Sequence, residues 1–160
     1  MADIYIGKIV GTHGIKGELK IISDFEKPSL IFQKDFPIYI EKEKHVIRTH
    51  RMHQNKHLVT VDSFANINDV LKYVNKLVYV KKEDINYNGY LLQELVGFYV
   101  YEQDECYGKV NEIMKTKAGY LLKVKHGDRI YYIPFIKEYI QSVNTQKKIV
   151  IGVNIKGLML

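Results

Sequence analysis

The sequence predicts a mainly β protein, two small β-barrels in tandem with one short helix in the first domain. Thirteen tyrosines and abundant Ile and Val favour strands over helices. Short runs of alternating apolar residues recur between turns rich in Gly, Asn, Asp and Lys. One stretch past the middle of the 160 residues loses this alternation, which divides the chain into two parts, each of marginal size for a domain.

Six short strands are expected in the first domain, which we place at residues 1–82. The expected strands cover 4–10, 18–22, 37–41, 46–52, 57–62 and 77–81. No helical crossovers separate them, which favours a closed barrel, and closure also removes exposed sheet edges.

One segment of the first domain has a helical period. Asn66 is a favourable N-cap residue, and apolar side chains follow it at helical spacing. The expected apolar face holds Ile67, Val70, Leu71 and Val74, and the expected polar face holds Asn68, Lys72 and Tyr73. We expect this helix to plug the barrel.

A glycine-rich stretch, IGKIVGTHGIKGELKI at residues 6–21, covers most of the first two expected strands and the segment between them. A Walker A loop needs Gly-Lys followed by Ser or Thr, but Lys16 is followed by Gly17. The dinucleotide fingerprint needs Gly-x-Gly-x-x-Gly before a helix, whereas a β-prone run follows here. The stretch therefore predicts a strand, a tight turn and a strand, with His13 in a structural role and no nucleotide or other cofactor.

Residues 83–90 lose the apolar alternation and are rich in turn formers, so we expect a linker there. A second domain follows at residues 91–160. Its expected strands cover 97–101, 106–114, 120–126, 129–133 and 148–153.

Alternation within the second domain separates its core side chains from its outward-facing ones. Val124 is expected toward the core, and Lys123 and Lys125 on the opposite face. Residues 125–129 are typical of a hairpin turn. The single cysteine, Cys106, is interpreted as a small buried apolar residue in a strand.

Composition narrows the class of partner. The chain has 24 basic and 18 acidic residues, a formal net charge of +6 and a pI of about 9.2. This mild surplus suits an anionic partner such as RNA. A single cysteine excludes an internal disulfide and fits a reducing compartment. Because the sequence begins with no signal peptide and has no apolar run long enough for a bilayer, we expect a cytoplasmic protein.

Four of the histidines are close in sequence, in the run HVIRTHRMHQNKH. They are His45, His50, His53 and His57. Zinc takes such ligands, but strand alternation places them on different faces and neighbouring basic residues would repel a cation, so we expect no metal. Two interpretations stay open: a hairpin in which Arg48 and Arg51 contact RNA phosphates beside the histidines, or a merely solvated hairpin.

Residues 6–20, IGKIVGTHGIKGELK, resemble the opening motif of RimM, a family of bacterial ribosome maturation factors. The second domain resembles a PRC barrel through short motifs that follow one another in the family's order. They are Leu95-Val96-Gly97, Tyr107-Gly108-Lys109-Val110, Ile133-Pro134-Phe135 and Lys156-Gly157-Leu158. Together the two resemblances cover nearly the whole chain.

The resemblance implies a translation-factor-like barrel followed by a PRC barrel, and a non-enzymatic accessory factor. We expect the protein to be a monomer. RimM-like proteins assist late assembly of the small-subunit head and efficient processing of small-subunit rRNA. They bind free small subunits but not complete ribosomes. The implied partners are a head ribosomal protein, small-subunit protein nineteen, and rRNA. No membrane partner and no cofactor is implied.

The family carries two adjacent tyrosines just before the PRC barrel that matter for subunit binding. Here the pair falls on Tyr90 and Leu91, so only the first position matches and the second keeps an apolar contact alone. These residues are the expected partner contacts, although they could instead join the two barrels. The expected contacts with rRNA phosphates are Lys16, Arg48 and Arg51.

Two other classes of function stay open. One is an enzyme that uses His13 or the histidine cluster as a base. The other is a general RNA-binding barrel without ribosomal specificity, which would show a steep salt dependence and no preference for the small subunit.

Overall fold

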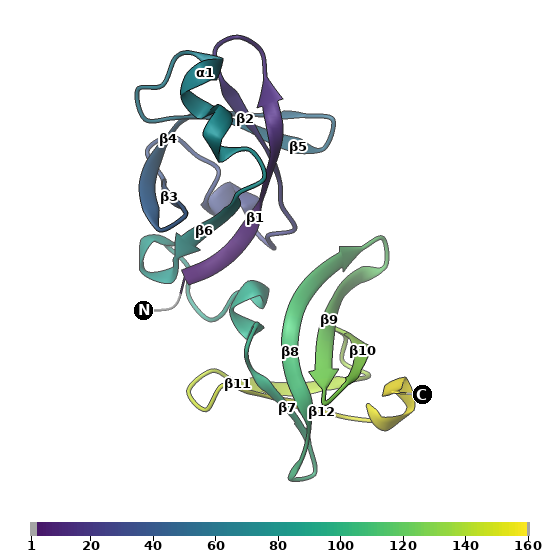
Figure 1. Ribbon diagram of the computed structural model, residues 1–160. Coiled ribbons are helices and arrows are strands. Elements are labelled where there is room, and N and C mark those ends of the chain that lie inside the picture. Colours follow the sequence, from purple (N-terminus) through teal and green to yellow (C-terminus); the bar gives the residue numbers. More distant parts are fainter. Residues whose placement is uncertain (1–2, 160) are drawn as a thin grey trace. The chain divides into compact units, whose positions relative to one another are not determined.

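A computed structural model describes residues 3–159, which form two compact units, one up to Asn88 and one from Gly89 (Figure 1). The predicted mainly β class with two β domains is confirmed. The short 3-10 helices are η1 (Pro28–Leu30), η2 (Leu71–Tyr73), η3 (Lys82–Asp84), η4 (Leu92–Leu95) and η5 (Lys156–Met159). Within residues 3–159, every helix is too short or too polar to cross a membrane.

Six antiparallel strands make the first unit. They are β1 (Asp3–His13), β2 (Glu18–Ile22), β3 (Pro37–Ile40), β4 (Glu43–His53), β5 (Lys56–Val61) and β6 (Leu77–Lys81). Their hydrogen-bonded order, β1-β2-β5-β4-β3-β6, closes on itself because β1 pairs with both β2 and β6. Each expected strand of this domain is present, and two of them, β1 and β4, are longer than alternation alone predicts.

The expected helix is shorter than predicted. Helix α1 (Ile67–Val70) begins as expected at Asn66, whose side-chain oxygen accepts a hydrogen bond from the Asn68 N–H at 2.8 Å. After Val70 the chain tightens into η2, which has three residues per turn, so Tyr73 and not Leu71 lies on the buried side. The prediction that Leu71 faces the barrel and Tyr73 faces solvent is therefore wrong. α1 lies where β1 ends and β2 begins (Figure 1).

The second unit is a six-stranded sheet. Its strands are β7 (Tyr99–Glu102), β8 (Glu105–Thr116), β9 (Gly119–His126), β10 (Arg129–Pro134), β11 (Ile140–Asn144) and β12 (Ile149–Gly152). The order is β10-β9-β8-β7-β12-β11, and the one parallel pair in the two sheets described is β12 with β7. β11 was not predicted, because IQSVN lacks a clear apolar alternation.

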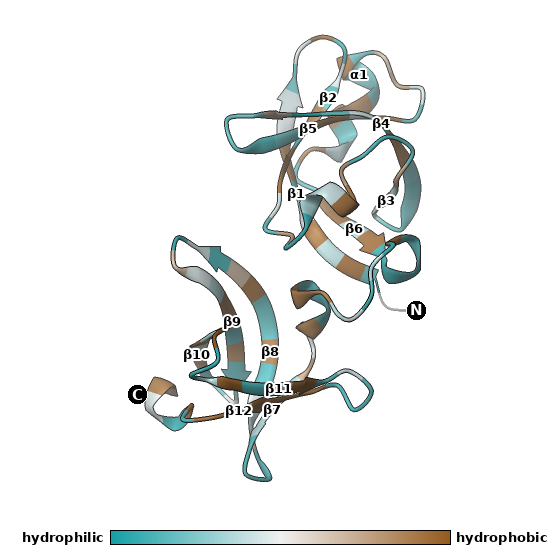
Figure 2. Cartoon of the chain, turned by 180° about the vertical axis from the view of Figure 1, so that it is seen from behind, coloured by the Kyte–Doolittle hydropathy of each residue, from teal (hydrophilic) through white to brown (hydrophobic). Residues whose placement is uncertain are grey.

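Alternating burial builds the core of the second unit, and hydrophobic and hydrophilic bands alternate along several strands in Figure 2. Of the adjacent tyrosines in β10, Tyr131 is buried and Tyr132 is exposed, as alternation predicts. The Tyr131 hydroxyl donates to the Tyr107 carbonyl oxygen at 2.7 Å, so the one polar atom of this core ring is satisfied. Burial raises the pKa of Tyr131 above its ordinary value.

Candidate functional site

The glycine-rich stretch forms a turn between two strands and not a phosphate loop. Gly14 and Gly17 have φ of +73° and +82°, a region that glycine enters without steric penalty. At Gly17 the backbone also passes close to the helix start, since a methyl group there would lie 2.9 Å from the Asn66 carbonyl oxygen. The Ile67 N–H donates to the Ile15 carbonyl at 2.9 Å, which fixes the turn against α1. Lys16 is thereby presented to solvent.

Arg51 lies over the neighbouring end of β2, where Glu18 holds it. Its guanidinium donates from Nε and Nη2 to the two carboxylate oxygens at 2.9 and 2.8 Å. This pairing lowers the pKa of Glu18, and nearby His13 and His53 lower it further. The rings of those two histidines lie 5.0 Å apart between centroids. The ends of the β1–β2 and β4–β5 hairpins thus bring together one exposed lysine, one oriented arginine and two histidines.

Arg48 contacts a different segment. Its Nε donates to the Asp62 carbonyl at 3.1 Å, and its Nη1 lies 3.6 Å from Asp35 Oδ1. A bulge in β4 between Ile47 and Thr49 shifts the register before Arg51 is reached. The structure therefore places Arg51 with the β1–β2 turn, while Arg48 has its own set of partners.

The histidines of β4 and β5 separate into different environments. His50 Nε2 and His57 Nδ1 lie 2.9 Å apart, and the ring of Phe32 stacks on His57 with centroids 3.8 Å apart. Burial lowers the pKa of His57 to about 4, and burial also lowers the pKa of His50. Both shifts favour the neutral imidazole, so this pair is poorly suited to neutralise a phosphate.

His45 is fully buried and ties three segments together. Its Nδ1 lies 2.6 Å from Asp62 Oδ2, and Asp62 Oδ1 accepts from the Val46 N–H at 2.8 Å. Its Nε2 is 3.0 Å from Glu43 Oε1, without the alignment of a hydrogen bond, and the Tyr73 hydroxyl donates to the same oxygen. His45 therefore has a structural role. Among residues 3–159, no three His, Cys or carboxylate side chains are grouped as metal ligands would be.

The predicted partner contacts have different exposures. Tyr90 is partly buried and packs against the core of the second unit. Leu91 is completely buried, and its N–H donates to Glu94 Oε2 at 2.6 Å while its carbonyl accepts from the Glu94 N–H at 2.9 Å. This reciprocal cap fixes the start of η4. Tyr90 can therefore present part of its surface to a partner, whereas Leu91 can act only through the position it gives to Tyr90.

Sequence reasoning missed the partner of Arg51 and the burial of Leu91. The Glu18–Arg51 pair joins residues of two hairpins, so only the closed strand order brings them together. Glu94, three residues after Leu91, was a local signal for the start of η4, because its carboxylate accepts from the Leu91 N–H. The burial of the Leu91 side chain had no such signal.

Two family models match the chain, the RimM N-terminal domain over residues 4–85 and the RimM PRC barrel domain over residues 92–158. The chain is 31% identical over 166 residues to the ribosome maturation factor RimM of an Exiguobacterium species, covering 98% of this chain and 96% of that protein. It is 29% identical over 165 residues to the protein of the same name from Staphylococcus aureus, covering 98% of each.

Two solved structures bear a weaker likeness, each at 17% identity. One is a putative 16S ribosomal RNA processing protein RimM from Pseudomonas aeruginosa, with a TM-score of 0.43 over 94% of this chain and 96% of that one. The other is the N-terminal domain of RimM from Thermus thermophilus, with a TM-score of 0.48 over 56% of this chain and 100% of that one.

Proposed function

Because the chain belongs to the RimM family of ribosome maturation factors, we propose that it assists assembly of the small ribosomal subunit as a binding protein and not as an enzyme. The ordered match of both family domains over nearly the whole chain carries this proposal. In the proposed role it acts in the cytoplasm as a monomer, binds free small subunits rather than complete ribosomes, and supports maturation of the subunit head and processing of small-subunit rRNA.

The proposed protein partner is the head protein of the small subunit, small-subunit protein nineteen. The proposed site consists of Tyr90, which makes the contact, and Leu91, which is buried and supports it. A tyrosine that is partly buried by its own domain loses little side-chain freedom on binding and offers both an apolar ring and a hydroxyl. Its packing against the second unit's core supports this role. Leu91, being buried, contributes by holding that tyrosine in place.

The proposed rRNA contacts are Lys16, Arg51 and Arg48. Arg51 uses two of its donors on Glu18 and keeps the others for a phosphate, with its guanidinium already oriented. Lys16 is exposed in the adjoining turn. Arg48 is half exposed and would contact a separate phosphate. The division into a first domain at 1–82, a linker at 83–90 and a second domain at 91–160 is part of the same proposal.

Co-sedimentation with separated ribosomal particles tests the proposed function. The full chain should pellet with free small subunits and stay in the supernatant with large subunits and complete ribosomes. Equal binding to all three particles, lost steeply with added salt, would instead favour a general RNA-binding protein. Binding to none of them would refute the proposal.

Tyr90→Ala should weaken this co-sedimentation by about tenfold or more if the ring is an interface anchor. Tyr87→Ala is the matched control, because Tyr87 is also partly buried and precedes Tyr90 by only three residues. Leu91→Ala is unsuitable as a binding test, since removing a fully buried leucine destabilises a protein by about 2–5 kcal/mol. Unchanged binding by folded Tyr90→Ala would remove Tyr90 from the site.

A further inference from the structure

A row of outward-facing side chains crosses the sheet of the second unit at one level. Ile130 of β10 is the cross-strand partner of Lys125 in β9, and Lys125 is the partner of Lys109 in β8. Lys109 in turn is the partner of Tyr99 in β7. All four residues are exposed. Four adjacent strands thus present an apolar side chain, two ammonium groups and a phenol ring in sequence.

Lys109 and Lys125 are cross-strand neighbours of like charge. Like charges directly opposite each other on neighbouring strands destabilise a sheet. Among the residues from 3 to 159, neither lysine has an ion-pair partner, whereas Lys123, two positions before Lys125, has its Nζ 3.7 Å from Glu112 Oε1. Anionic groups bound at these two lysines would offset the repulsion, so this part of the sheet favours an anionic partner.

Tyr99 gives the same row an aromatic surface. The Nζ of Lys109 lies 5.5 Å from the centroid of the Tyr99 ring, close enough for a cation–π interaction. The tyrosine is nevertheless 47% exposed. A half-exposed ring beside a lysine is the arrangement in which proteins stack a base while neutralising its phosphate.

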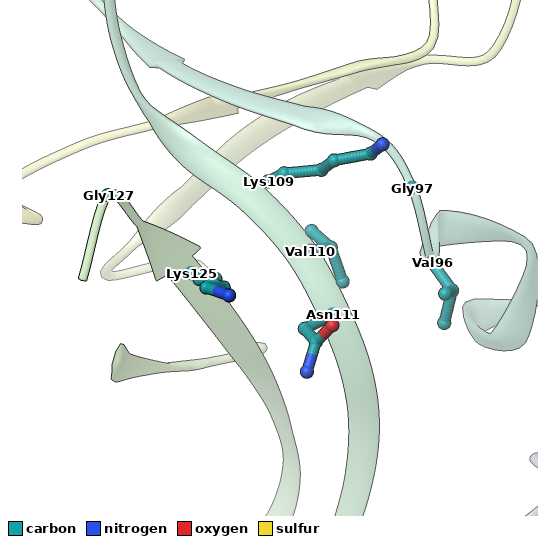
Figure 3. A pocket seen from close by; sticks show the side chains of 7 residues that line it. All are labelled: Val96, Gly97, Lys109, Val110, Asn111, Lys125 and Gly127. Carbon is teal, nitrogen blue, oxygen red and sulfur yellow. The ribbon is translucent and has the colours of Figure 1, made fainter. Parts of the chain in front are cut away.

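A hollow of about 450 Å³ lies beside this row, lined by Lys109, Lys125 and Asn111 and by backbone at Gly97 and Gly127 (Figure 3). In Figure 3, Lys109 extends toward Gly97, with Lys125 on the neighbouring strand and Asn111 further along β8. Asn111 offers an amide that both donates and accepts hydrogen bonds. The hollow is open, so it suits a chain segment lying across the sheet better than an enclosed small molecule.

We propose that this face of the second unit binds single-stranded RNA, with one phosphate on Lys109, another on Lys125 and a base stacked on Tyr99. Bases in single strands are free to stack on an aromatic side chain, which those of a duplex are not. This inference extends the proposed function without depending on it, since RNA binding by the free protein is measured without ribosomal particles.

Fluorescence anisotropy of the full chain with a labelled single-stranded RNA of about 12 nucleotides tests the proposal. Lys109→Gln/Lys125→Gln should weaken binding by about fivefold or more and reduce the slope of log affinity against log salt by about 1.4, the value for two lost phosphate contacts on a single strand. Tyr99→Leu should weaken binding by about fivefold with no change in that slope, and Tyr99→Phe should bind as the wild type does.

Lys123→Gln is the matched control, because it removes one positive charge from the same face at a lysine already paired with Glu112. It should change the affinity by less than about twofold. A control that weakens binding as much as the double variant would mean that only net charge matters, and would overturn the site. A double variant that binds like the wild type, with an unchanged thermal transition, would overturn it as well.

Two competitors separate RNA from other anionic partners. Inorganic tripolyphosphate that displaces the RNA, together with an unaffected Tyr99→Leu variant, would indicate a phosphate site without base stacking. Tighter binding of an oligoglutamate peptide than of RNA would indicate an acidic protein segment. Either result refutes the RNA proposal. If the wild-type chain binds the RNA but does not co-sediment with small subunits, only the proposed function is refuted.

Discussion

Gly17→Ala should strongly destabilise the first unit, because the turn meets the helix start at this residue. With φ at +82°, an alanine incurs the left-handed penalty of about 1–2 kcal/mol. Its methyl group would also lie 2.9 Å from the Asn66 carbonyl oxygen and 3.0 Å from the carbonyl carbon. Those atoms are backbone, so the turn and α1 have to move apart.

The free-energy cost of that separation follows from the contacts that it weakens. It weakens the hydrogen bond from the Ile67 N–H to the Ile15 carbonyl, worth about 1 kcal/mol, and disturbs the Asn66 cap, worth about 1 kcal/mol. The total is therefore about 3–4 kcal/mol. Gly14→Ala is the matched control, because its φ is +73° but nothing lies within 4 Å of the added methyl group. Gly14→Ala should lower the free energy of unfolding only by the left-handed backbone penalty, about 1–2 kcal/mol.

Scanning calorimetry of the full chain measures both variants. A difference of about 2 kcal/mol in a domain of this size corresponds to about 8–16 °C in the transition temperature. Gly17→Ala should therefore melt at a clearly lower temperature than Gly14→Ala. Equal transition temperatures would refute the reasoning, because they would show that the approach of the turn to Asn66 costs nothing to relax.

Three further predictions concern single side chains. The pKa of Glu18 in the folded state is lowered from 4.5, so its carboxylate stabilises the fold above pH 4.5 and this stabilisation is lost as the pH falls. The difference in transition temperature between the wild type and Glu18→Gln should therefore shrink from pH 7 to pH 3. The pKa of His57 is lowered from 6.5 to about 4, so between pH 6.5 and pH 4 the unfolded state binds more protons than the folded state. The free energy of unfolding, measured in urea, should therefore fall from pH 6.5 to pH 4, and it should fall less steeply in His57→Phe. An unchanged pH profile in either variant would contradict the assignment. Tyr131→Phe leaves the buried Tyr107 carbonyl without its donor and should lower the free energy of unfolding by about 1–3 kcal/mol; a neutral effect would mean that the hydrogen bond contributes nothing.

The strands could be predicted because their signals are local. Alternation with a period of two located β2 and β6 to the residue. The same alternation explains why Tyr131 is buried while its neighbour Tyr132 is exposed. The failures depend on tertiary structure or on a change of period. β11 has no clear alternation of buried and exposed residues, and it forms a strand by pairing with β12. The change from α-helix to 3-10 helix after Val70 places Tyr73, and not Leu71, on the buried side.

The site was less predictable than the fold, because charge partners come from distant parts of the chain. Basic residues in β4 could be recognised, but the sequence does not show that Arg51 is held by Glu18 while Arg48 contacts Asp62. The outward direction of Lys125 could be predicted from alternation. Its position opposite Lys109 could not, since a bulge in β8 sets that register.

The parallel pairing of β12 with β7 determines when the second sheet can form during synthesis. β7 is the first strand of its sheet to leave the ribosome, yet its neighbour on one side is made only after four other strands. The first unit can close once β6 has emerged, whereas the second sheet has an unpaired inner edge until residues 149–152 are available. A nascent chain should therefore acquire protease resistance in two separate steps, and one arrested before residue 149 should keep only the first.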